Sequence, residues 1–98
     1  MNRNETIHLL RMHAAVIRNF GATALHLYGS GARDELRPDS DIDLFIDYDP
    51  EGPFSFVELI RLERYLAAAL KRDVDITTRA GLHPALRETI ERSSMRVL

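Results

Sequence analysis

The chain has no cysteine and no tryptophan, and it contains no long apolar run. Without cysteine there is no disulfide framework and no thiolate metal site, which fits a reducing compartment. The amino-terminal stretch mixes charged residues such as Arg3, Glu5 and Arg11 with its apolar residues. It is therefore typical neither of a signal peptide nor of a membrane span. We expect a cytoplasmic protein that does not bind membranes.

An excess of charge of one sign is also absent. The chain has 13 Lys and Arg residues against 15 Asp and Glu residues, a formal net charge of −2 with neutral histidines. Because the basic residues are scattered, nothing indicates direct nucleic-acid binding. The hydrophobic share of 45% and the charged share of 29% are ordinary for a folded protein. We expect one domain spanning residues 1–98.

Hydrophobic periodicity predicts alternating helices and strands. Apolar residues recur at helical spacing after Asn4, a good N-cap, and predict a first helix. The S-x-x-E pattern from Ser55 to Glu58 predicts the start of a second helix, and Pro84 the first turn of a third. Three segments alternate between apolar and polar residues as strands do. In chain order we expect a helix over about 5–20, strands over 24–28 and 41–47, a helix over about 56–71, a strand over 73–77 and a helix from residue 83.

This α-β-β-α-β-α order indicates an α/β (α+β) fold. No internal repeat or linker interrupts it, and the closing residues MRVL have no clear pattern. We expect a small mixed β-sheet with helices packed on one face.

Two of the expected strands carry acidic residues on one face. Asp41 and Asp43 lie two residues apart, so their side chains share a face and are about 6 to 7 Å apart at the backbone. Asp75 can join them if its strand is a neighbour. Three converging carboxylates repel one another, and a divalent cation relieves that repulsion. Hard oxygen ligands favour magnesium or manganese over zinc, and few carboxylates with room for water and phosphate suit Mg²⁺.

A glycine-flanked serine follows the first strand directly. Around Ser30, between Gly29 and Gly31, backbone N–H groups and the hydroxyl can face a phosphate without obstruction by side chains. A phosphate cradle opposite a metal site favours phosphoryl or nucleotidyl transfer assisted by two ions about 3.5 to 4 Å apart. Asp75 is then the expected general base. Arg33 either contacts a phosphate or braces the turn by pairing with an acid such as Asp43 or Asp34, and bracing is favoured.

The segment LYGSGARDELRPDSDIDLFID resembles the signature of the DNA polymerase beta nucleotidyltransferase superfamily. That signature is a Gly-Ser pair, ten residues, Asp-x-Asp and a third Asp on a later strand, and it is matched by Gly29, Ser30, Asp41, Asp43 and Asp75. Further features resemble the minimal nucleotidyltransferases, the MntA-type antitoxins: the length, Ala32 and Arg33 after the turn, Pro38 and Ser40 before the acidic strand, and the closing HPALRETIERS. The chain departs from their pattern at Asp34, where many members carry glycine.

The resemblance implies an enzyme with ATP as substrate and Mg²⁺ as cofactor. It assigns catalysis and metal binding to the three matching aspartates, and nucleotide binding to Gly29, Ser30 and Arg33. It also implies a partner, a HEPN-type toxin that is a helical RNase, onto one of whose tyrosines the antitoxin transfers AMP. Because no residues are left for a second domain, we expect the partner to complete the site.

Two alternatives stay open. A binding-only antitoxin would block its toxin sterically, with metal and nucleotide incidental. A nucleotidyltransferase acting on a small-molecule acceptor would need an enclosing pocket, which so short a core forms only by oligomerising. Whether the chain self-associates as a homo-oligomer is not decided by the sequence.

Overall fold

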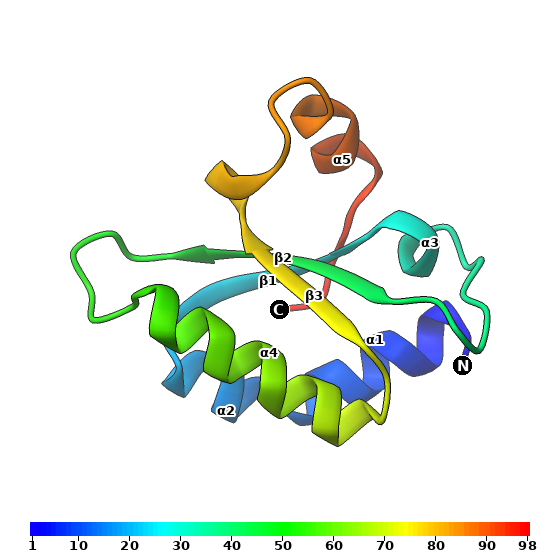
Figure 1. Ribbon diagram of the computed structural model, residues 1–98, viewed down its shortest axis with the longest axis horizontal. Helices are drawn as coiled ribbons and strands as arrows, with labels where there is room; N and C mark the ends of the chain where they lie inside the picture. Colours follow the sequence, from blue (N-terminus) through cyan, green and yellow to red (C-terminus); the bar gives the residue numbers. More distant parts are fainter.

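A mixed four-stranded sheet organises the fold (Figure 1). The computed structural model describes residues 1–98. The sheet has the order β3-β2-β1-β4, with bounds β1 Ala22–Tyr28, β2 Ile42–Tyr48, β3 Val74–Thr78 and β4 Met95–Arg96. Strand β2 runs antiparallel to β1 and parallel to β3, and β4 runs antiparallel to β1. The expected fold class is confirmed.

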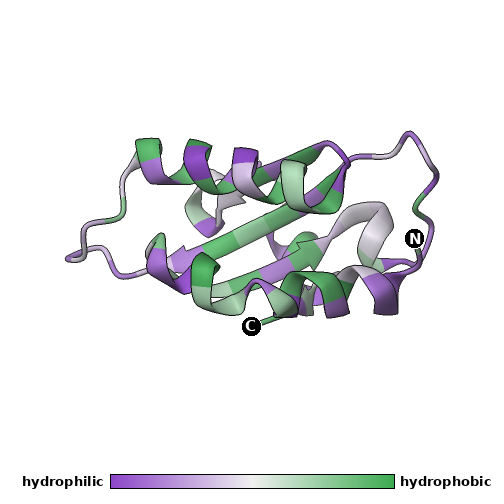
Figure 2. Ribbon diagram, turned by 90° about the horizontal axis from the view of Figure 1, so that it is seen from below, coloured by the Kyte–Doolittle hydropathy of each residue, from purple (hydrophilic) through white to green (hydrophobic).

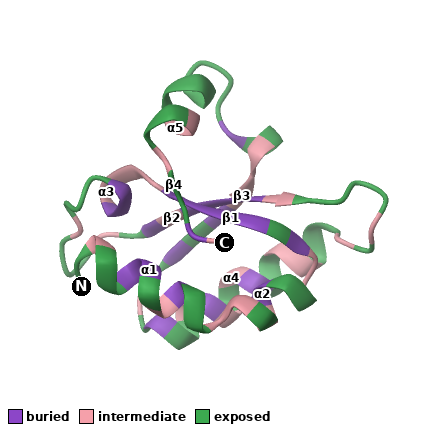
Figure 3. Cartoon of the chain, turned by 180° about the vertical axis from the view of Figure 1, so that it is seen from behind, coloured by how far each residue is buried: buried purple, intermediate pink, exposed green.

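Three helices cover one face of this sheet, namely α1 (Arg3–Met12), α2 (Ala14–Asn19) and α4 (Phe56–Leu70) (Figures 1 and 3). Each carries an apolar and a polar side (Figure 2). Their apolar sides meet alternate strand residues in a core of 16 buried residues, in which Leu10, Ile17, Leu44, Leu62 and Leu66 have no exposed surface. None of the helices has both the length and the apolar character needed to span a membrane.

Helix α4 begins where the sequence predicts. Ser55 is the N-cap, and the capping box forms in both directions, because the Ser55 side chain contacts the N3 backbone while the Glu58 carboxylate accepts the Ser55 N–H at 3.2 Å. Leu62, Leu66 and Leu70 lie four residues apart and are buried, so this stripe faces the sheet. The helix ends at Lys71, which adopts the left-handed conformation with φ 55°.

The expected first helix is two helices rather than one. The break lies at His13, where the backbone has φ −101° and ψ 15° and the N–H turns to Leu10 O at 3.0 Å. The His13 ring packs edge-on to Tyr65 of α4, and its Nδ1 lies 2.8 Å from the Tyr65 hydroxyl. Because this contact joins residues 52 apart, the local pattern does not reveal it.

The carboxyl-terminal part also differs from expectation. After β3 come a short 3-10 helix, η1 (Arg79–Gly81), and a turn in which Leu86 N–H donates to His83 O at 2.9 Å. Pro84 lies in that turn, and helix α5 spans Arg87–Ser93, on the other side of the sheet from α4 (Figures 1 and 3). The closing tail forms β4, and Val97 N–H donates to Leu25 O at 2.8 Å.

Candidate active site

One row of polar side chains crosses three strands on the sheet face opposite α1, α2 and α4. Asp43 is paired in register with Tyr28 of β1 on one side and with Asp75 of β3 on the other. Ile42 and Leu44, its neighbours in β2, point into the core, so Asp43 points away from it. Adjacent strands lie about 4.8 Å apart, so the pairing brings Asp43 and Asp75 together.

Asp41 lies at the edge of this row. It immediately precedes β2 and is exposed. Its charge still acts on Asp43, since burial raises the pKa of the Asp43 carboxyl and the negative charges of Asp75 and Asp41 raise that pKa further, while Arg33 opposes them. Burial and the negative charges of Asp43 and Asp75 raise the pKa of Tyr28 to about 12. The site therefore carries more negative charge than its own residues neutralise.

The glycine-flanked turn is folded directly over Asp43. Residues Gly29–Ala32 form a single helical turn, α3, rather than an irregular loop. Gly29 has φ 67°, and a Cβ atom there would lie 2.6 Å from Asp43 Oδ2. Gly31 lies close to a different side chain, because a Cβ atom there would lie 2.8 Å from Leu27 Cδ1. Gly29 thus lets the turn approach the carboxylate, and Ser30 follows it in the turn.

Arg33 pairs with an acid other than those expected. Its Nε lies 3.1 Å from Glu35 Oε2, and both side chains are exposed. Neither Asp43 nor Asp34 forms an ion pair with it, although its charge lowers the pKa of Asp43. The guanidinium therefore stays on the surface at the end of α3.

Asp34 closes the turn with a positive φ of 60°. Its Oδ1 accepts the backbone N–H of Arg3 at 2.7 Å, and Arg3 Nη1 donates to Ala32 O at 3.3 Å. The left-handed conformation explains why glycine suits this position. Here an aspartate adopts it and ties the start of α1 to the end of α3.

The carboxylates suit a cation that arrives with its substrate. No group of three or more carboxylate or imidazole side chains lies close enough together to hold a metal ion. The expected three-aspartate site is therefore not preformed. Mg²⁺ in proteins commonly uses one or two carboxylates and completes its shell with water and substrate phosphates. Asp43 opposite Asp75, with Asp41 beside them, supplies that donor set on an open face.

A second polar cluster on the same face was not predicted. Asp47 lies four residues beyond Asp43, and its carboxylate accepts two hydrogen bonds from Arg79, at 2.7 and 2.9 Å. His26 Nε2 lies 3.0 Å from Asp47 Oδ2, and Arg79 also pairs with Glu91 of α5 at 3.1 Å. The Arg79 bonds dominate in lowering the pKa of Asp47 to about 2, and His26 contributes. This cluster attaches α5 to the sheet.

Phe45 separates the two clusters. It lies on β2 between Asp43 and Asp47 and has no exposed surface. His26 stacks on its ring with centroids 4.5 Å apart, and the Arg79 guanidinium lies 5.0 Å from the ring centroid. The two-residue period along β2 could have indicated Asp47, whereas nothing in the sequence links it to Arg79.

Comparisons with known proteins show which family and fold the chain shares. A family model described as a nucleotidyltransferase domain matches residues 11–97. The protein adenylyltransferase MntA of Thermococcus cleftensis is 34% identical over 85 residues, covering 86% of this chain and 84% of the relative. A solved structure described as a "putative minimal nucleotidyltransferase" superposes with a TM-score of 0.81 and 32% identity, covering 97% of this chain and 95% of the other. A toxin-antitoxin crystal structure with AMP-PNP shares the fold, with a TM-score of 0.70, 22% identity and coverage of 100% and 73%.

The backbone at Asp34 yields a stability prediction. Asp34→Asn should match the parent protein in urea unfolding, because Asn tolerates positive φ and keeps an acceptor oxygen. Asp34→Gly should lose the bond to Arg3 only. Asp34→Ala loses that bond and adds strain, so its free energy of unfolding should be lowest, by about 1 to 2 kcal/mol against Asp34→Gly. Equal stability of the Gly and Ala variants would contradict this account of the turn.

The raised pKa of Asp43 predicts that the site weakens the fold. A folded pKa above the unfolded value of 3.8 means that stability from this carboxyl is present below that pH and is lost as the pH rises through the folded pKa. Asp43→Asn should therefore raise Tm at pH 7, and its advantage should disappear near pH 3. Asp39→Asn, which changes an exposed carboxylate, is the control. A Tm gain that is the same at both pH values would argue against charge repulsion.

Proposed function

Because the chain belongs to the nucleotidyltransferase domain family, we propose that it acts as a Mg²⁺-dependent protein adenylyltransferase within a toxin-antitoxin pair. In this proposal it transfers AMP from ATP to a tyrosine of a HEPN-type toxin. The observation that carries the proposal is the pairing of Asp43 with Asp75 beneath the Gly29 turn. The relative named protein adenylyltransferase MntA and the toxin-antitoxin structure with AMP-PNP support the acceptor and the nucleotide.

The proposed reaction exchanges one phosphorus–oxygen bond for another. The tyrosine hydroxyl oxygen attacks the α-phosphorus of ATP, the bond from that phosphorus to the β-phosphate oxygen breaks, and pyrophosphate leaves with its electron pair. Asp75 takes the hydroxyl proton as general base. Asp41, Asp43 and Asp75 would hold Mg²⁺, which neutralises phosphate charge when bound.

The turn after β1 is suited to the leaving side of this reaction. Ser30 is half-buried, and its hydroxyl makes no hydrogen bond within the chain, so it is free to donate to a phosphate oxygen. Arg33 lies on the surface at the end of the same turn and adds positive charge there. These residues orient the triphosphate, while the carboxylates face its α-phosphorus.

A protein acceptor suits the openness of the site. Asp41 and Asp75 are exposed, and no helix of this chain covers them. A small acceptor would need an enclosing pocket. A docking protein can cover the row from Tyr28 to Asp75 and bring the hydroxyl with it. A binding-only antitoxin is the competing proposal, and loss of the carboxylates separates the two.

Intact-mass measurement tests the proposal directly. Incubation of the protein with its partner toxin, ATP and Mg²⁺ should add one or more AMP units to the toxin. The double variant Asp41→Asn, Asp43→Asn should add none and should fail to neutralise the toxin. If this variant still neutralises the toxin at ordinary expression levels, the binding-only proposal is correct. If the toxin gains mass with another nucleotide instead, that nucleotide and not ATP is the donor.

Asp75 should separate binding from transfer. Asp75→Asn keeps an oxygen ligand but no longer accepts a proton, so it should retain nucleotide binding in calorimetry while transfer falls about 100-fold or more. Asp73→Asn, which changes an exposed side chain two residues earlier on the way into β3, is the matched control. Weak nucleotide binding with a normal transfer rate would show that Asp75 is not the base.

A further inference from the structure

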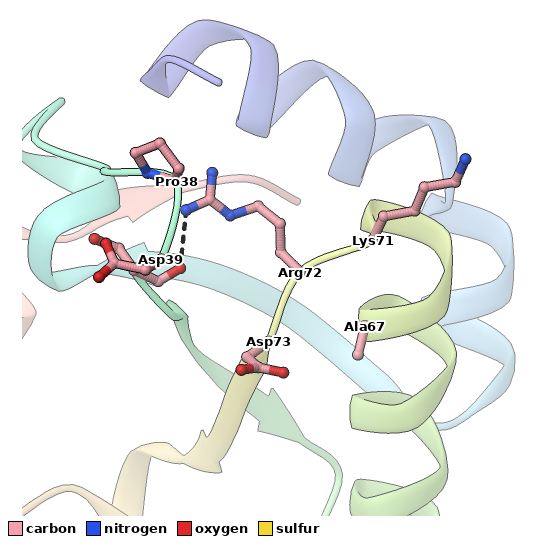
Figure 4. Close-up of a pocket in the computed structure, with 7 residues that line it drawn as sticks. Pro38, Asp39, Ala67, Lys71, Arg72 and Asp73 are labelled. Atoms are coloured by element: carbon pink, nitrogen blue, oxygen red, sulfur yellow. Dashed lines mark hydrogen bonds between the residues drawn. The ribbon is translucent and has the colours of Figure 1, made fainter.

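A cavity of about 430 Å³ lies where the chain enters β2 and β3, next in sequence to Asp41 and close to Asp75. It is lined by Pro38, Asp39, Ser40, Ala67, Lys71, Arg72 and Asp73 (Figure 4). Its charged side chains do not converge on a common point. Lys71 points away from the others, whereas Arg72 reaches across to the segment that contains Pro38 and Asp39 (Figure 4). This arrangement indicates that Arg72 connects the two sides of the cavity and that the cavity is not a ligand site.

Arg72 bonds to the turn that precedes Asp41. Its Nη2 donates to Ser40 O at 2.9 Å and also to Arg37 O. The turn is closed by two further bonds, from Ser40 N–H to Arg37 O and from Arg37 N–H to Ser40 Oγ, both 3.0 Å. The guanidinium therefore binds both ends of a turn whose shape is already defined.

The backbone on both sides of Asp41 is hydrogen-bonded to two consecutive residues, Arg72 and Asp73. The residue before Asp41, Ser40, accepts from the Arg72 side chain, and the residue after it, Ile42, donates its N–H to Asp73 O at 2.9 Å. Asp75 follows only two residues later on β3. The segment from Arg72 to Asp75 thus contains Asp75 itself and holds the backbone on both sides of Asp41.

The left-handed residue at the end of α4 directs Arg72 toward this turn. Lys71 has φ 55° and ψ 41°, which ends the helix and turns the chain sharply into β3. The Arg72 N–H still donates to Ala67 O at 3.3 Å. The Arg72 Nε is buried without a hydrogen-bond partner. The position of the guanidinium therefore allows the two Nη2 bonds and leaves the Nε donor unsatisfied.

We propose that Arg72 is a positioning residue that sets Asp41 relative to Asp75 for transfer. This inference rests on the proposed function, in which both carboxylates act together. A misplacement of about 1 Å in such a site can cost a factor of about 100 in rate. Arg72 touches no reacting atom in this scheme, so its loss should change the arrangement of the site and leave the core of the sheet intact.

The test combines a measurement without substrate and a kinetic one. In Arg72→Ala, amide hydrogen exchange should become at least about tenfold faster at Ser40 and Ile42, whose N–H groups are bonded within the braced segment. Exchange at Leu25, in the core of β1, should not change. The transfer rate at saturating ATP should fall at least about tenfold, with KM for ATP within about threefold of the parent value. Arg72→Lys keeps a donor and should recover part of both losses.

Arg64→Ala is the matched control, because Arg64 is an exposed arginine of α4 with no hydrogen bond to the chain. Faster exchange at Leu25 by the same factor would show that Arg72 only stabilises the fold. Unchanged exchange at Ser40 and Ile42, or faster exchange with an unchanged transfer rate, would overturn the positioning role. If the parent protein transfers no AMP, the proposed function fails separately, and positioning of Asp41 is then supported or rejected by the exchange data alone.

Discussion

The repulsion between two carboxylates on neighbouring strands governs how this small domain is arranged. The parallel register of β2 and β3 sets Asp43 opposite Asp75, and the antiparallel register of β1 and β2 adds Tyr28 beside them. Such a row lowers stability unless a ligand neutralises it. The two faces of the sheet differ in character. The buried core and helices α1, α2 and α4 lie on one face, and the charged side chains lie on the other. The charged face is open around Asp41 and Asp75, whereas α5 is attached to it near Asp47.

Two aspartates on the same face of β2 show how surroundings assign roles. Asp47 receives a two-bond contact from Arg79 and a third from His26, and its pKa falls to about 2. Asp43 has no such partner, and its pKa moves the other way. The two aspartates thus have pKa shifts in opposite directions because their surroundings differ, and the buried ring of Phe45 lies between them. Asp47, which has these partners, helps to attach α5, and Asp43, which lacks them, is the aspartate that the proposed function assigns to substrate.

The sequence predicts the parts whose signal is local. Alternation along β2 indicates which side chains share the face of Asp43, and the capping box at Ser55 marks the start of α4. The turn at Gly29 and the acidic residues follow from their spacing. Contacts between distant segments leave no such signal: the break at His13 depends on Tyr65 of α4. Likewise β4 is two residues long and too short for a period, and it forms only because β1 has a free edge.

The brace at Arg72 is beyond sequence reasoning for a further reason. Its acceptors are backbone carbonyls, which every residue possesses, so no residue type at positions 37 or 40 marks the contact. The alternation of β3 predicts Asp75, yet says nothing of the residues that lead into the strand. Side chains that position a site through hydrogen bonds to backbone carbonyls are therefore identified from the folded structure and not from the sequence.

The close approach of Gly29 to Asp43 has an evolutionary consequence. A side chain at position 29 collides with a carboxylate oxygen and not with the backbone, so the two positions constrain each other. In a lineage that abandoned catalysis and replaced Asp43 with a smaller residue, that collision would disappear, and Asn or Asp, which tolerate positive φ, would become acceptable at position 29. Among descendants of such a domain, the residue at position 29 would then record whether its ancestors kept the carboxylate.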